Sequence, residues 1–371
     1  VRGEIASQLS PVAIARLGSH LLFANAMIDA AYYIGIRDRT RVDPSIAIWA
    51  DHRSSSTASA LRNLRKYISA PKEHRFSSEE DGFSIYDAAG LGRDENSWAP
   101  RPYGAYSLLR DIRKRSFPKV SDCFDVKQGV RTGLNGAFLV KKEFVLSLPE
   151  KERAFFKPAV VNESINNGQL SDRIYVFYPY DQNGCFFKRE IELKRSVPVY
   201  FEKLLRPHKE KLQKRARIDE SEWWILSEHR AWQTTPRPKI VSTYFGKSDS
   251  FAWDPSGTYV VVQGHAWLRL GGKTTKDFPN QVGLAYLAVL NDSIVDILLS
   301  GVSNHVGGGQ WNLSKRFIAE MPLPDLFASG VSTELLKELS EFGQAIHKGR
   351  DFDRDKLTKF VRSIFSVTSP M

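Results

Sequence analysis

A cluster of polar side chains beside a glycine-rich stretch near residue 130 has the chemistry for contacting nucleic-acid bases. Its members are Lys127, Gln128, Arg131, Thr132 and Asn135. Arginine and glutamine form paired hydrogen bonds with the edges of guanine and adenine, and glycines let a backbone approach a ligand closely. The cluster predicts contacts with base edges in a DNA groove. The alternative is a plain exposed hairpin.

Two later clusters carry side chains of the same kinds. Tyr244 and Lys247 follow an apolar run at residues 239–243, and a glycine-rich loop at 307–309 precedes a third group. That group predicts base contacts from its amides and phosphate contacts from its cations, while its tryptophan could instead anchor the loop in the core. Its members are Gln310, Trp311, Asn312, Lys315 and Arg316. The loop lacks the Gly-Lys-[Ser/Thr] ending of a nucleotide triphosphate site.

Catalytic and metal-binding patterns are absent from the sequence. The eight histidines are scattered, and the sequence contains neither an HExxH nor a GxSxG motif. The two cysteines, Cys123 and Cys185, do not have the spacing of metal ligands. No Pro-Pro pair occurs anywhere, and no glycine cluster follows an apolar strand near the N-terminus. We therefore predict no catalytic residue, no metal ligand and no cofactor site in this chain.

A strongly basic interval runs from Lys188 to Arg217. It holds eleven Lys or Arg residues against four Glu, and its apolar positions have the spacing of a helical insertion. A charged helix is usually a solvated face, but this imbalance equally favours contact with phosphates. Trp223 and Trp224, which follow it, are predicted to pack in a core or an interface.

Composition favours a polyanionic partner and a folded chain. Lys and Arg outnumber Asp and Glu by 53 to 42, which gives a formal net charge of +11. A length of 371 residues predicts two or three domains. The longest apolar stretches, around 21–36 and 285–302, contain Asn and Asp residues, so no membrane span is predicted. The first residues, Val1-Arg2-Gly3-Glu4, suggest a piece of a longer chain in a cytoplasmic setting.

The elements that must position these clusters follow from hydrophobic periodicity. A short helix at 1–9, apolar strands at 13–23 and 30–36, and helices at 58–69 and 106–114 are expected first. Residues 119–142 predict a β-hairpin with its turn at 132–136. Further strands are expected at 174–180, 239–244, 251–254 and 259–263, with a turn at 254–257. Helices are expected at 284–300, 334–347 and 356–365.

Several of these segments together resemble a known protein family. The sequence is similar to the target-recognition region of gamma-class N6-adenine DNA methyltransferases from bacterial restriction-modification systems. The similarity lies in residues 124–138, Pro238-Lys239-Ile240-Val241, Tyr286 to Asn291, and Gly307 to Leu313. Asp292 stands where the family usually has Ser. Val1-Arg2, Phe23-Ala24-Asn25-Ala26 and Tyr32 to Ile36 resemble the end of the family's catalytic domain.

The resemblance implies an α+β fold in four parts. Residues 1–52 would be the closing edge of a Rossmann-like catalytic domain, 53–115 a partly helical connector, 116–330 a mostly β target-recognition domain with helical insertions, and 331–371 a helical tail. The complete enzyme would use S-adenosylmethionine and flip an adenine from double-stranded DNA in a bacterial or archaeal cell. This chain would supply sequence choice to a catalytic region missing from it. The alternatives are a non-enzymatic specificity subunit that docks a separate catalytic subunit through residues 1–50, and part of a fused endonuclease and methyltransferase.

Overall fold

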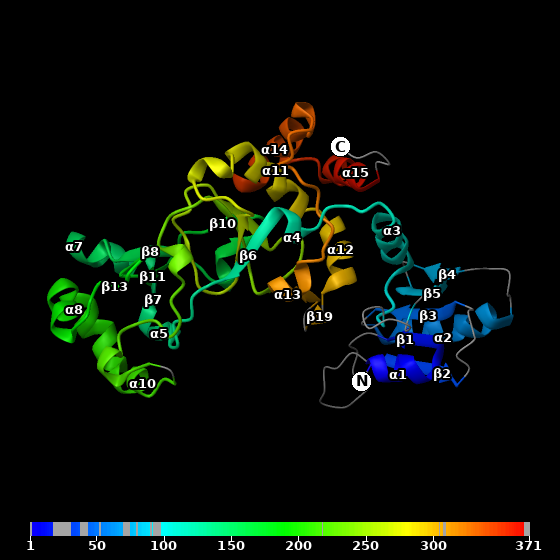
Figure 1. The fold of residues 1–371 in the computed structure, drawn as a ribbon, viewed down its shortest axis with the longest axis horizontal. Helices are drawn as coiled ribbons and strands as arrows, with labels where there is room; N and C mark the ends of the chain where they lie inside the picture. The colour runs from blue at the N-terminus through cyan, green and yellow to red at the C-terminus, as the bar shows by residue number, and fades with distance from the viewer. Residues whose placement is uncertain are drawn as a thin grey trace. The chain divides into compact units, whose positions relative to one another are not determined.

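The computed structural model divides into two compact units. It describes residues 2–17, 31–37, 44–51, 53–69, 75–78, 81–89, 91, 98–216, 218–303, 305–306 and 309–366. The chain passes from the first unit to the second between Ser116 and Phe117 (Figure 1). Helices and small sheets alternate in both, so the fold is mixed α+β.

The first unit is built around one five-stranded sheet. Its strands are β1 (Ser10–Arg16), β2 (Ala31–Ile36), β3 (Ser45–Ala50), β4 (Arg75–Ser78) and β5 (Phe83–Ala88) in the order β2-β1-β3-β5-β4. Only the β1–β3 pair is parallel. The segment 53–115, which was expected to be a connector, thus contributes β4 and β5 to the same sheet as β1, β2 and β3. The Phe23–Ala26 match lies outside the described residues.

Helices cover both faces of this sheet because side chains alternate along each strand. Helix α1 (Arg2–Gln8) precedes β1, and α2 (Ser54–Ser69) packs Ala60 and Tyr67 with Ile85 of β5. Tyr86, the next residue of β5, instead joins a cluster with tyrosines of α3 (Tyr103–Arg113). The helices expected at 1–9, 58–69 and 106–114 are confirmed.

The second unit contains two four-stranded sheets. The first has β6 (Phe124–Gln128), β14 (Lys239–Ser242), β16 (Phe251–Asp254) and β18 (His265–Arg269), all antiparallel, in the order β16-β14-β18-β6. The second has β7 (Leu139–Lys141), β8 (Phe156–Val160), β11 (Ile174–Phe177) and β17 (Val260–Val261) in the order β17-β8-β11-β7. The four strands expected between 174 and 263 are present, although β17 is shorter than predicted.

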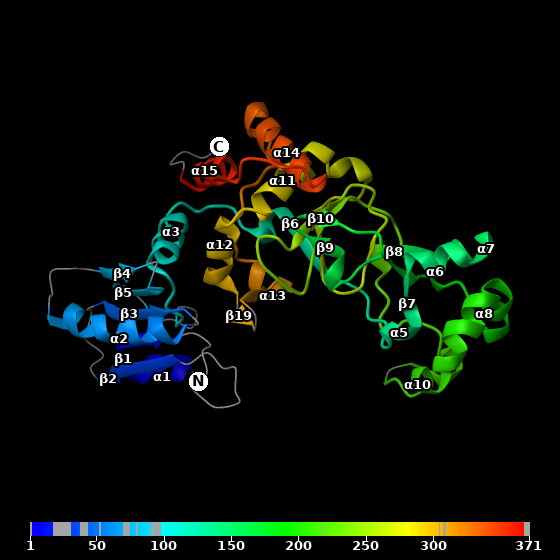
Figure 2. The ribbon, with the colours of Figure 1, turned by 180° about the vertical axis from the view of Figure 1, so that it is seen from behind.

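Shorter elements complete the β-structure of this unit. The hairpins β9 (Ile165–Asn166) with β10 (Gln169–Leu170) and β12 (Tyr180–Asp181) with β13 (Gly184–Cys185) are antiparallel. A three-stranded sheet joins β15 (Phe245–Gly246), β20 (Gln310–Asn312) and β19 (His305–Val306) in the order β15-β20-β19. Figure 2 shows β9 and β10 from behind. The turn expected at 254–257 is present, with the Gly257 amide donating to Asp254 Oδ1 over 2.8 Å.

The prediction of a β-hairpin over residues 119–142 is wrong. Residues Val120–Cys123 form the helical turn α4 and Asn135–Phe138 the helical turn α5, and β6 and β7 enter different sheets. The chain leaves the first sheet at Gly129, where an added Cβ would lie 2.4 Å from the Val261 carbonyl oxygen. It then forms reciprocal backbone hydrogen bonds of 3.0 Å between Arg131 and Glu228. Partners distant in sequence thus replace the local pairing.

The single helix expected over 284–300 is also wrong. It is two helices, α11 (Asn280–Leu290) and α12 (Ile294–Val302), with a 78° bend between them. The side-chain Nδ2 of Asn291 donates to the Leu287 carbonyl oxygen at the end of α11. The backbone amide of Ile294 donates to Asp292 Oδ1 at the start of α12. Polar side chains that bond to nearby backbone favour helix ends over helix interiors.

Helices α14 (Thr333–His347) and α15 (Arg354–Ser366) confirm the two predicted terminal helices. Helix α14 lies beside α11 in both views (Figures 1 and 2). Gly343 permits this approach, because a Cβ there would lie 1.9 Å from the Leu284 carbonyl oxygen. Among the described helices, none alone is long and apolar enough to cross a membrane. The bent pair of α11 and α12 reaches that length and hydropathy together, and Val282 to Leu290 are buried.

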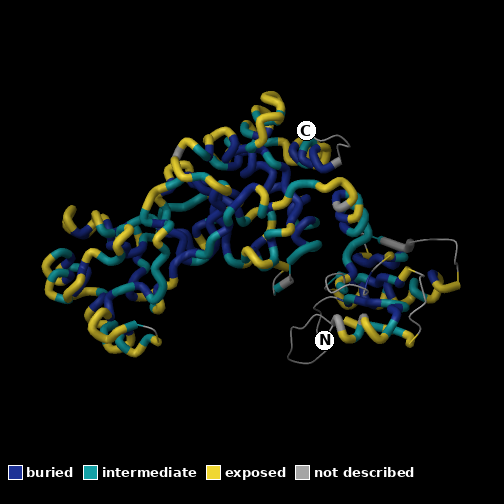
Figure 3. Tube along the Cα trace, viewed as in Figure 1, coloured by how far each residue is buried: buried dark blue, intermediate teal, exposed yellow. Residues whose placement is uncertain are grey.

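The basic interval forms the helical insertion that its periodicity predicts. It contains α8 (Glu190–Ser196), α9 (Pro198–Tyr200), the π-helical turn η2 (Phe201–Leu205), the 3-10 turn η3 (Arg206–His208) and α10 (Lys209–Gln213). Most of their apolar side chains join the core of the second sheet, together with the buried Trp223 and Trp224, whereas Ile191 of α8 is exposed. The outer turns of these helices are exposed, as Figure 3 shows around α8 and α10 of Figure 1.

Candidate functional site

Three strands of the first sheet of the second unit bring polar side chains to one end. Gln128 ends β6, His265 begins β18, and Ser242 ends β14, and the register pairs His265 with both of the others. Because neighbouring antiparallel strands run in opposite directions, the end of one lies beside the start of the next. Tyr244 follows β14 and therefore lies at the same sheet end.

The short sheet next to this end adds the third polar cluster. Phe245 of β15 pairs with Asn312 of β20, and the Leu313 amide donates to the Tyr244 carbonyl oxygen over 3.0 Å. The chain then enters α13 (Lys315–Ile318), which starts with Lys315 and Arg316. Two segments expected to carry separate clusters, near 244 and 312, are thereby joined by backbone pairing.

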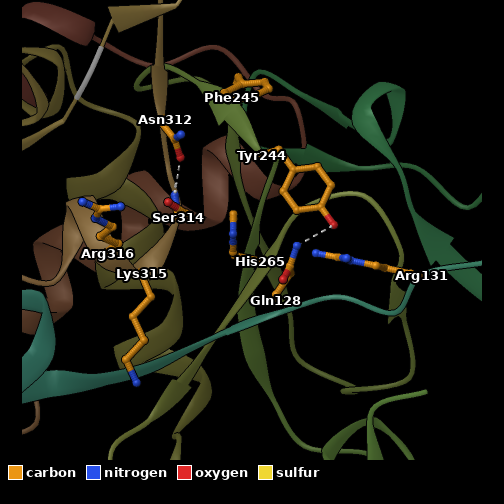
Figure 4. Close-up of a pocket in the computed structure, with 9 residues that line it drawn as sticks. All are labelled: Gln128, Arg131, Tyr244, Phe245, His265, Asn312, Ser314, Lys315 and Arg316. Atoms are coloured by element: carbon orange, nitrogen blue, oxygen red, sulfur yellow. Dashed lines mark hydrogen bonds between the residues drawn. The ribbon is translucent and has the colours of Figure 1, made fainter. Parts of the chain in front are cut away.

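These residues line a pocket of about 560 Å³, called here the sheet-end pocket. Figure 4 shows Tyr244, Gln128 and His265 around its middle and the cations toward its sides. A planar ring, amides and cations around one opening are the groups that proteins use toward nucleic-acid bases and phosphates. The lining residues are Gln128, Arg131, Tyr244, Phe245, His265, Asn312, Ser314, Lys315 and Arg316.

Tyr244 is held over the pocket by long hydrogen bonds. Gln128 Nε2 donates to the Tyr244 hydroxyl oxygen over 3.4 Å, and that hydroxyl donates to the Val262 carbonyl oxygen over 3.4 Å. The Tyr244 ring meets His265 edge to face, with 5.2 Å between ring centres. Bonds this long are weak, so the Gln128 amide can exchange its partner for a ligand at little cost.

His265 is the buried member of the pocket lining. Its side chain is 3% exposed, and its Nδ1 atom is buried without a hydrogen-bond partner. Burial lowers the pKa of His265 to about 4, although a hydrogen bond with the Thr243 backbone opposes the shift. The ring is therefore neutral at neutral pH, and the positive charge of the pocket comes from Arg131, Lys315 and Arg316.

The lowered pKa of His265 predicts an acid-sensitive stability. The unfolded chain takes up this proton near pH 6.5, whereas the folded protein resists it down to about pH 4. Stability is therefore unaffected above pH 6.5 and falls by about 3 kcal/mol as pH decreases from there to pH 4. Urea unfolding at several pH values measures this loss, and the His265→Gln variant is the control because it lacks the group. Parallel pH profiles for the two proteins would show that His265 titrates normally.

Arg131, which lines the pocket, shares the carboxylate of Glu228 with Arg230. Arg131 Nε lies 3.3 Å from Glu228 Oε2, and Arg230 Nη1 lies 2.8 Å from Glu228 Oε1. Arg230 also donates through Nε to the Gly129 carbonyl oxygen over 3.3 Å. Two guanidinium groups on one carboxylate leave a positive excess. The Arg131 side chain is 55% exposed and remains accessible to a ligand.

A second shared carboxylate lies on the other side of the pocket. Asp125 bonds Lys315 over 3.1 Å and Lys127 over 3.2 Å. Partial burial raises the pKa of Asp125, but the hydrogen bonds from these two lysines outweigh it and lower the pKa. Within the described part of the chain, Arg316 has no carboxylate at ion-pair distance. Exposed pairs of this kind are weak, so phosphates can compete for Lys315.

The pocket gathers half of the residues singled out from the sequence. Gln128, Arg131, Tyr244, Asn312, Lys315 and Arg316 line it. The remaining candidates do not. Lys127 forms an ion pair with Asp125. Thr132 is buried, and its hydroxyl donates to Asn135 Oδ1 over 2.6 Å. Lys247 and Gln310 are exposed and Trp311 is half-buried, all outside the lining.

Three lining residues were not among the predicted site residues: Phe245, His265 and Ser314. His265 is one of eight histidines that stand outside any catalytic motif in the sequence. Its signal lies in the strand register, because it starts the strand that pairs with both Gln128 and Ser242. That pairing cannot be read from local periodicity. Ser314 directly precedes the two predicted cations, and the exposed Phe245 directly follows Tyr244.

No group of three or more His, Cys, Asp or Glu side chains among the described residues could hold a metal ion. Both cysteines are free, and burial raises the pKa of each thiol. A raised thiol pKa disfavours the thiolate that metal binding and nucleophilic attack require.

Comparison with known proteins supports a fold and no family. No family model matches the sequence, and no curated protein matches it. The structure is similar to the type IIL restriction-modification enzyme MmeI in complex with DNA, at 9% identity and a TM-score of 0.50, over 98% of this chain and 46% of MmeI. It is also similar to the type IIG restriction endonuclease BpuSI, at 11% identity and a TM-score of 0.45, over 98% of this chain and 44% of BpuSI. The chain spans less than half the length of either protein.

Proposed function

We propose that this chain binds double-stranded DNA sequence-specifically and supplies target recognition to an adenine-N6 DNA methyltransferase of a restriction-modification system. The observation that carries the proposal is the sheet-end pocket, which brings together side chains that are distant in the sequence: an arginine, two amides, a tyrosine and the adjacent cations Lys315 and Arg316. The likeness of the fold to MmeI, a restriction-modification enzyme solved with DNA, supports it. The residue resemblance to target-recognition regions points the same way.

Each side chain has a role in this proposal. Arg131 is suited to a guanine edge, because its exposed guanidinium donates two parallel hydrogen bonds. Gln128 and Asn312 offer amides that both donate and accept, as the adenine edge requires. Lys315 and Arg316 bind backbone phosphates, which fix the position of the duplex without reading its sequence.

Methyl transfer is assigned to another part of the complete enzyme. The sulfonium centre of S-adenosylmethionine is positively charged, and the sheet-end pocket is lined by three cations and no carboxylate. The pocket therefore does not fit that cofactor. The sequence also lacks the Pro-Pro loop that the family uses to hold the target adenine. We derive no methyl-transfer step from this chain, and propose that a separate segment or subunit supplies it.

Substitutions at the pocket separate base reading from phosphate binding. We expect Arg131→Ala or Gln128→Ala to relax the preference for one base pair by roughly tenfold to a hundredfold. Lys315→Ala should weaken binding to all duplexes about equally and flatten its salt dependence. Competition binding between duplexes that differ at single positions measures both effects.

Gln310→Ala is the matched control for Gln128→Ala. Both remove an amide from the end of a strand, but Gln310 lies outside the pocket lining. We expect Gln310→Ala to leave base preference unchanged. An unchanged preference in Arg131→Ala and Gln128→Ala as well would contradict the assignment of this pocket to base reading.

A further inference from the structure

The helical insertion of the second unit exposes basic side chains and packs apolar ones into the core. Its buried residues recur at helical spacing, so one stripe of the insertion packs into the core beneath the second sheet. The opposite positions are left in solvent. The buried stripe consists of Leu193, Val197, Tyr200, Phe201, Leu205 and Leu212.

Three of the four glutamates in the insertion are already neutralised. Glu190 bonds Lys209 over 2.8 Å, and Glu192 bonds Arg189 over 2.7 Å. Glu202 bonds both Lys194 and Arg206, over 3.3 and 2.7 Å. Among the described residues, Glu210 is therefore the one glutamate of the insertion that has no cation at ion-pair distance.

Five cations of the insertion remain exposed and have no carboxylate at ion-pair distance within the described part of the chain. They are Lys188, Arg195, Lys203, Lys211 and Lys214. We call them the insertion cations. Lys211 and Lys214 are three residues apart and so project from one side of α10 and its end. Unbalanced like charges repel one another, and a polyanion that binds them relieves that repulsion.

The insertion is fixed to the chain segment that carries Arg131. Arg215, which follows α10, donates through Nη1 to the Thr132 carbonyl oxygen over 2.8 Å and to Ser227 Oγ over 3.2 Å. Its other nitrogens bond the carbonyl oxygens of Trp223, Ile225 and Leu212. Thr132 is the neighbour of the pocket residue Arg131. The insertion and the pocket therefore belong to one connected framework.

We propose that the insertion cations form a second DNA-contact surface, which binds backbone phosphates of the same duplex and reads no bases. This inference rests on the proposed function. Four of the five cations are lysines, whose ammonium groups act as point charges toward phosphates and lack the planar fork used for base edges. Both α10 and α13, the helix of Lys315 and Arg316, lie on the lower side of the second unit in Figures 1 and 2. Because Arg215 joins the insertion to the residue next to Arg131, one duplex would contact the pocket and the insertion together.

The test is a triple neutralisation, Lys203→Gln with Lys211→Gln and Lys214→Gln. The matched control is Lys337→Gln with Lys348→Gln and Lys359→Gln, which removes the same charge from exposed positions of α14 and α15 and the turn after α14. The probe is a random-sequence duplex of about 30 base pairs, longer than one helical turn. Its dissociation constant is measured between about 50 and 200 mM salt, and duplex selection is run in parallel.

We expect the insertion variant to bind the random duplex on the order of tenfold to a hundredfold more weakly and to lower the salt slope by about 2 to 3. The selected DNA word stays the same, and the control variant binds like the parent protein. An insertion variant with the parent's affinity and slope overturns this inference alone, as does one that selects a different word. If the parent protein binds no duplex, the proposed function fails first. If the parent protein then binds anionic phospholipid vesicles and the insertion variant does not, the partner of the insertion cations is a membrane surface.

Discussion

Replacing Asp254 with asparagine is expected to destabilise the second unit by about 3–5 kcal/mol, because it leaves a buried ammonium without its counter-charge. Lys239 and Asp254 face each other across β14 and β16, with 2.7 Å between Nζ and Oδ2. Their side chains are 4% and 0% exposed. Burial lowers the pKa of Lys239, and the Asp254 carboxylate opposes that shift.

Asp254 also organises the turn that follows it. Its carboxylate accepts hydrogen bonds from the Gly257 and Tyr259 amides, over 2.8 and 3.1 Å, and from the Ser256 hydroxyl. Lys239 donates in turn to the Gly257 carbonyl oxygen over 2.8 Å. The substitution therefore affects the charge pair and the turn together, and adding Lys239→Met should recover part of the loss by removing the unpaired charge.

Urea unfolding followed by tryptophan fluorescence measures this loss, because most tryptophans of the chain lie in the second unit. The matched control is Asp172→Asn, which breaks the exposed ion pair of Asp172 with Lys142. Exposed pairs contribute about 1 kcal/mol or less, so the control should lose little. Equal losses for Asp254→Asn and Asp172→Asn would contradict the role given to the buried pair.

Arg215→Lys is expected to lower stability by about 2–3 kcal/mol and to reduce base preference, although it keeps the positive charge. The half-buried guanidinium bonds four backbone carbonyl groups and one hydroxyl, and lies over the Phe138 ring at 5.6 Å. A lysine cannot reach these acceptors at once. Gly133 makes the fit tighter, since its φ is +77° and a Cβ there would lie 2.7 Å from Arg215 Cδ.

The neighbouring Lys214 provides the control for Arg215. Lys214→Gln removes an exposed charge that has no carboxylate partner among the described residues, so stability should change by less than about 0.5 kcal/mol. It should weaken binding to all duplexes slightly, whereas Arg215→Lys reduces the preference for one word over others. Urea unfolding and duplex competition give the two readouts. Arg215→Lys with unchanged stability would show that its hydrogen bonds do not hold the Thr132 segment.

Local sequence patterns predicted many elements of this fold. Strand β16 spans the expected Phe251–Asp254, and α14 starts one residue before the expected Glu334. Both are specified by periodicity and by nearby turn or capping residues, such as Ser332, whose hydroxyl accepts a hydrogen bond from the Leu335 amide. Sequence reading succeeds where neighbouring residues determine the structure.

Long-range pairing explains why the predicted hairpin is wrong. Residues 119–142 alternate as a hairpin does, yet β6 pairs with β18 and β7 with β11. Alternation shows that a segment can be a strand but does not choose its partner. The helix predicted at 284–300 failed for another reason, because its apolar stripe continues across Asn291 and Asp292, whose side chains bond the backbone at a helix end.

The candidate site followed the same division. Side-chain chemistry identified Gln128, Arg131, Asn312 and Lys315, which the fold gathers around one pocket. Chemistry alone also selected Thr132, which is buried and bonds Asn135, and Gln310, which lies outside the lining. Whether such a residue reaches the pocket depends on strand register, and so does the inclusion of His265.

Selection of duplexes from a random pool by this purified chain, with and without S-adenosylmethionine, tests the central claim most directly. The account predicts enrichment of one short adenine-containing word, equal in both conditions, and loss of preference at one position in Arg131→Ala. A pool that stays random, with binding that vanishes uniformly as salt rises, would contradict sequence recognition by this chain.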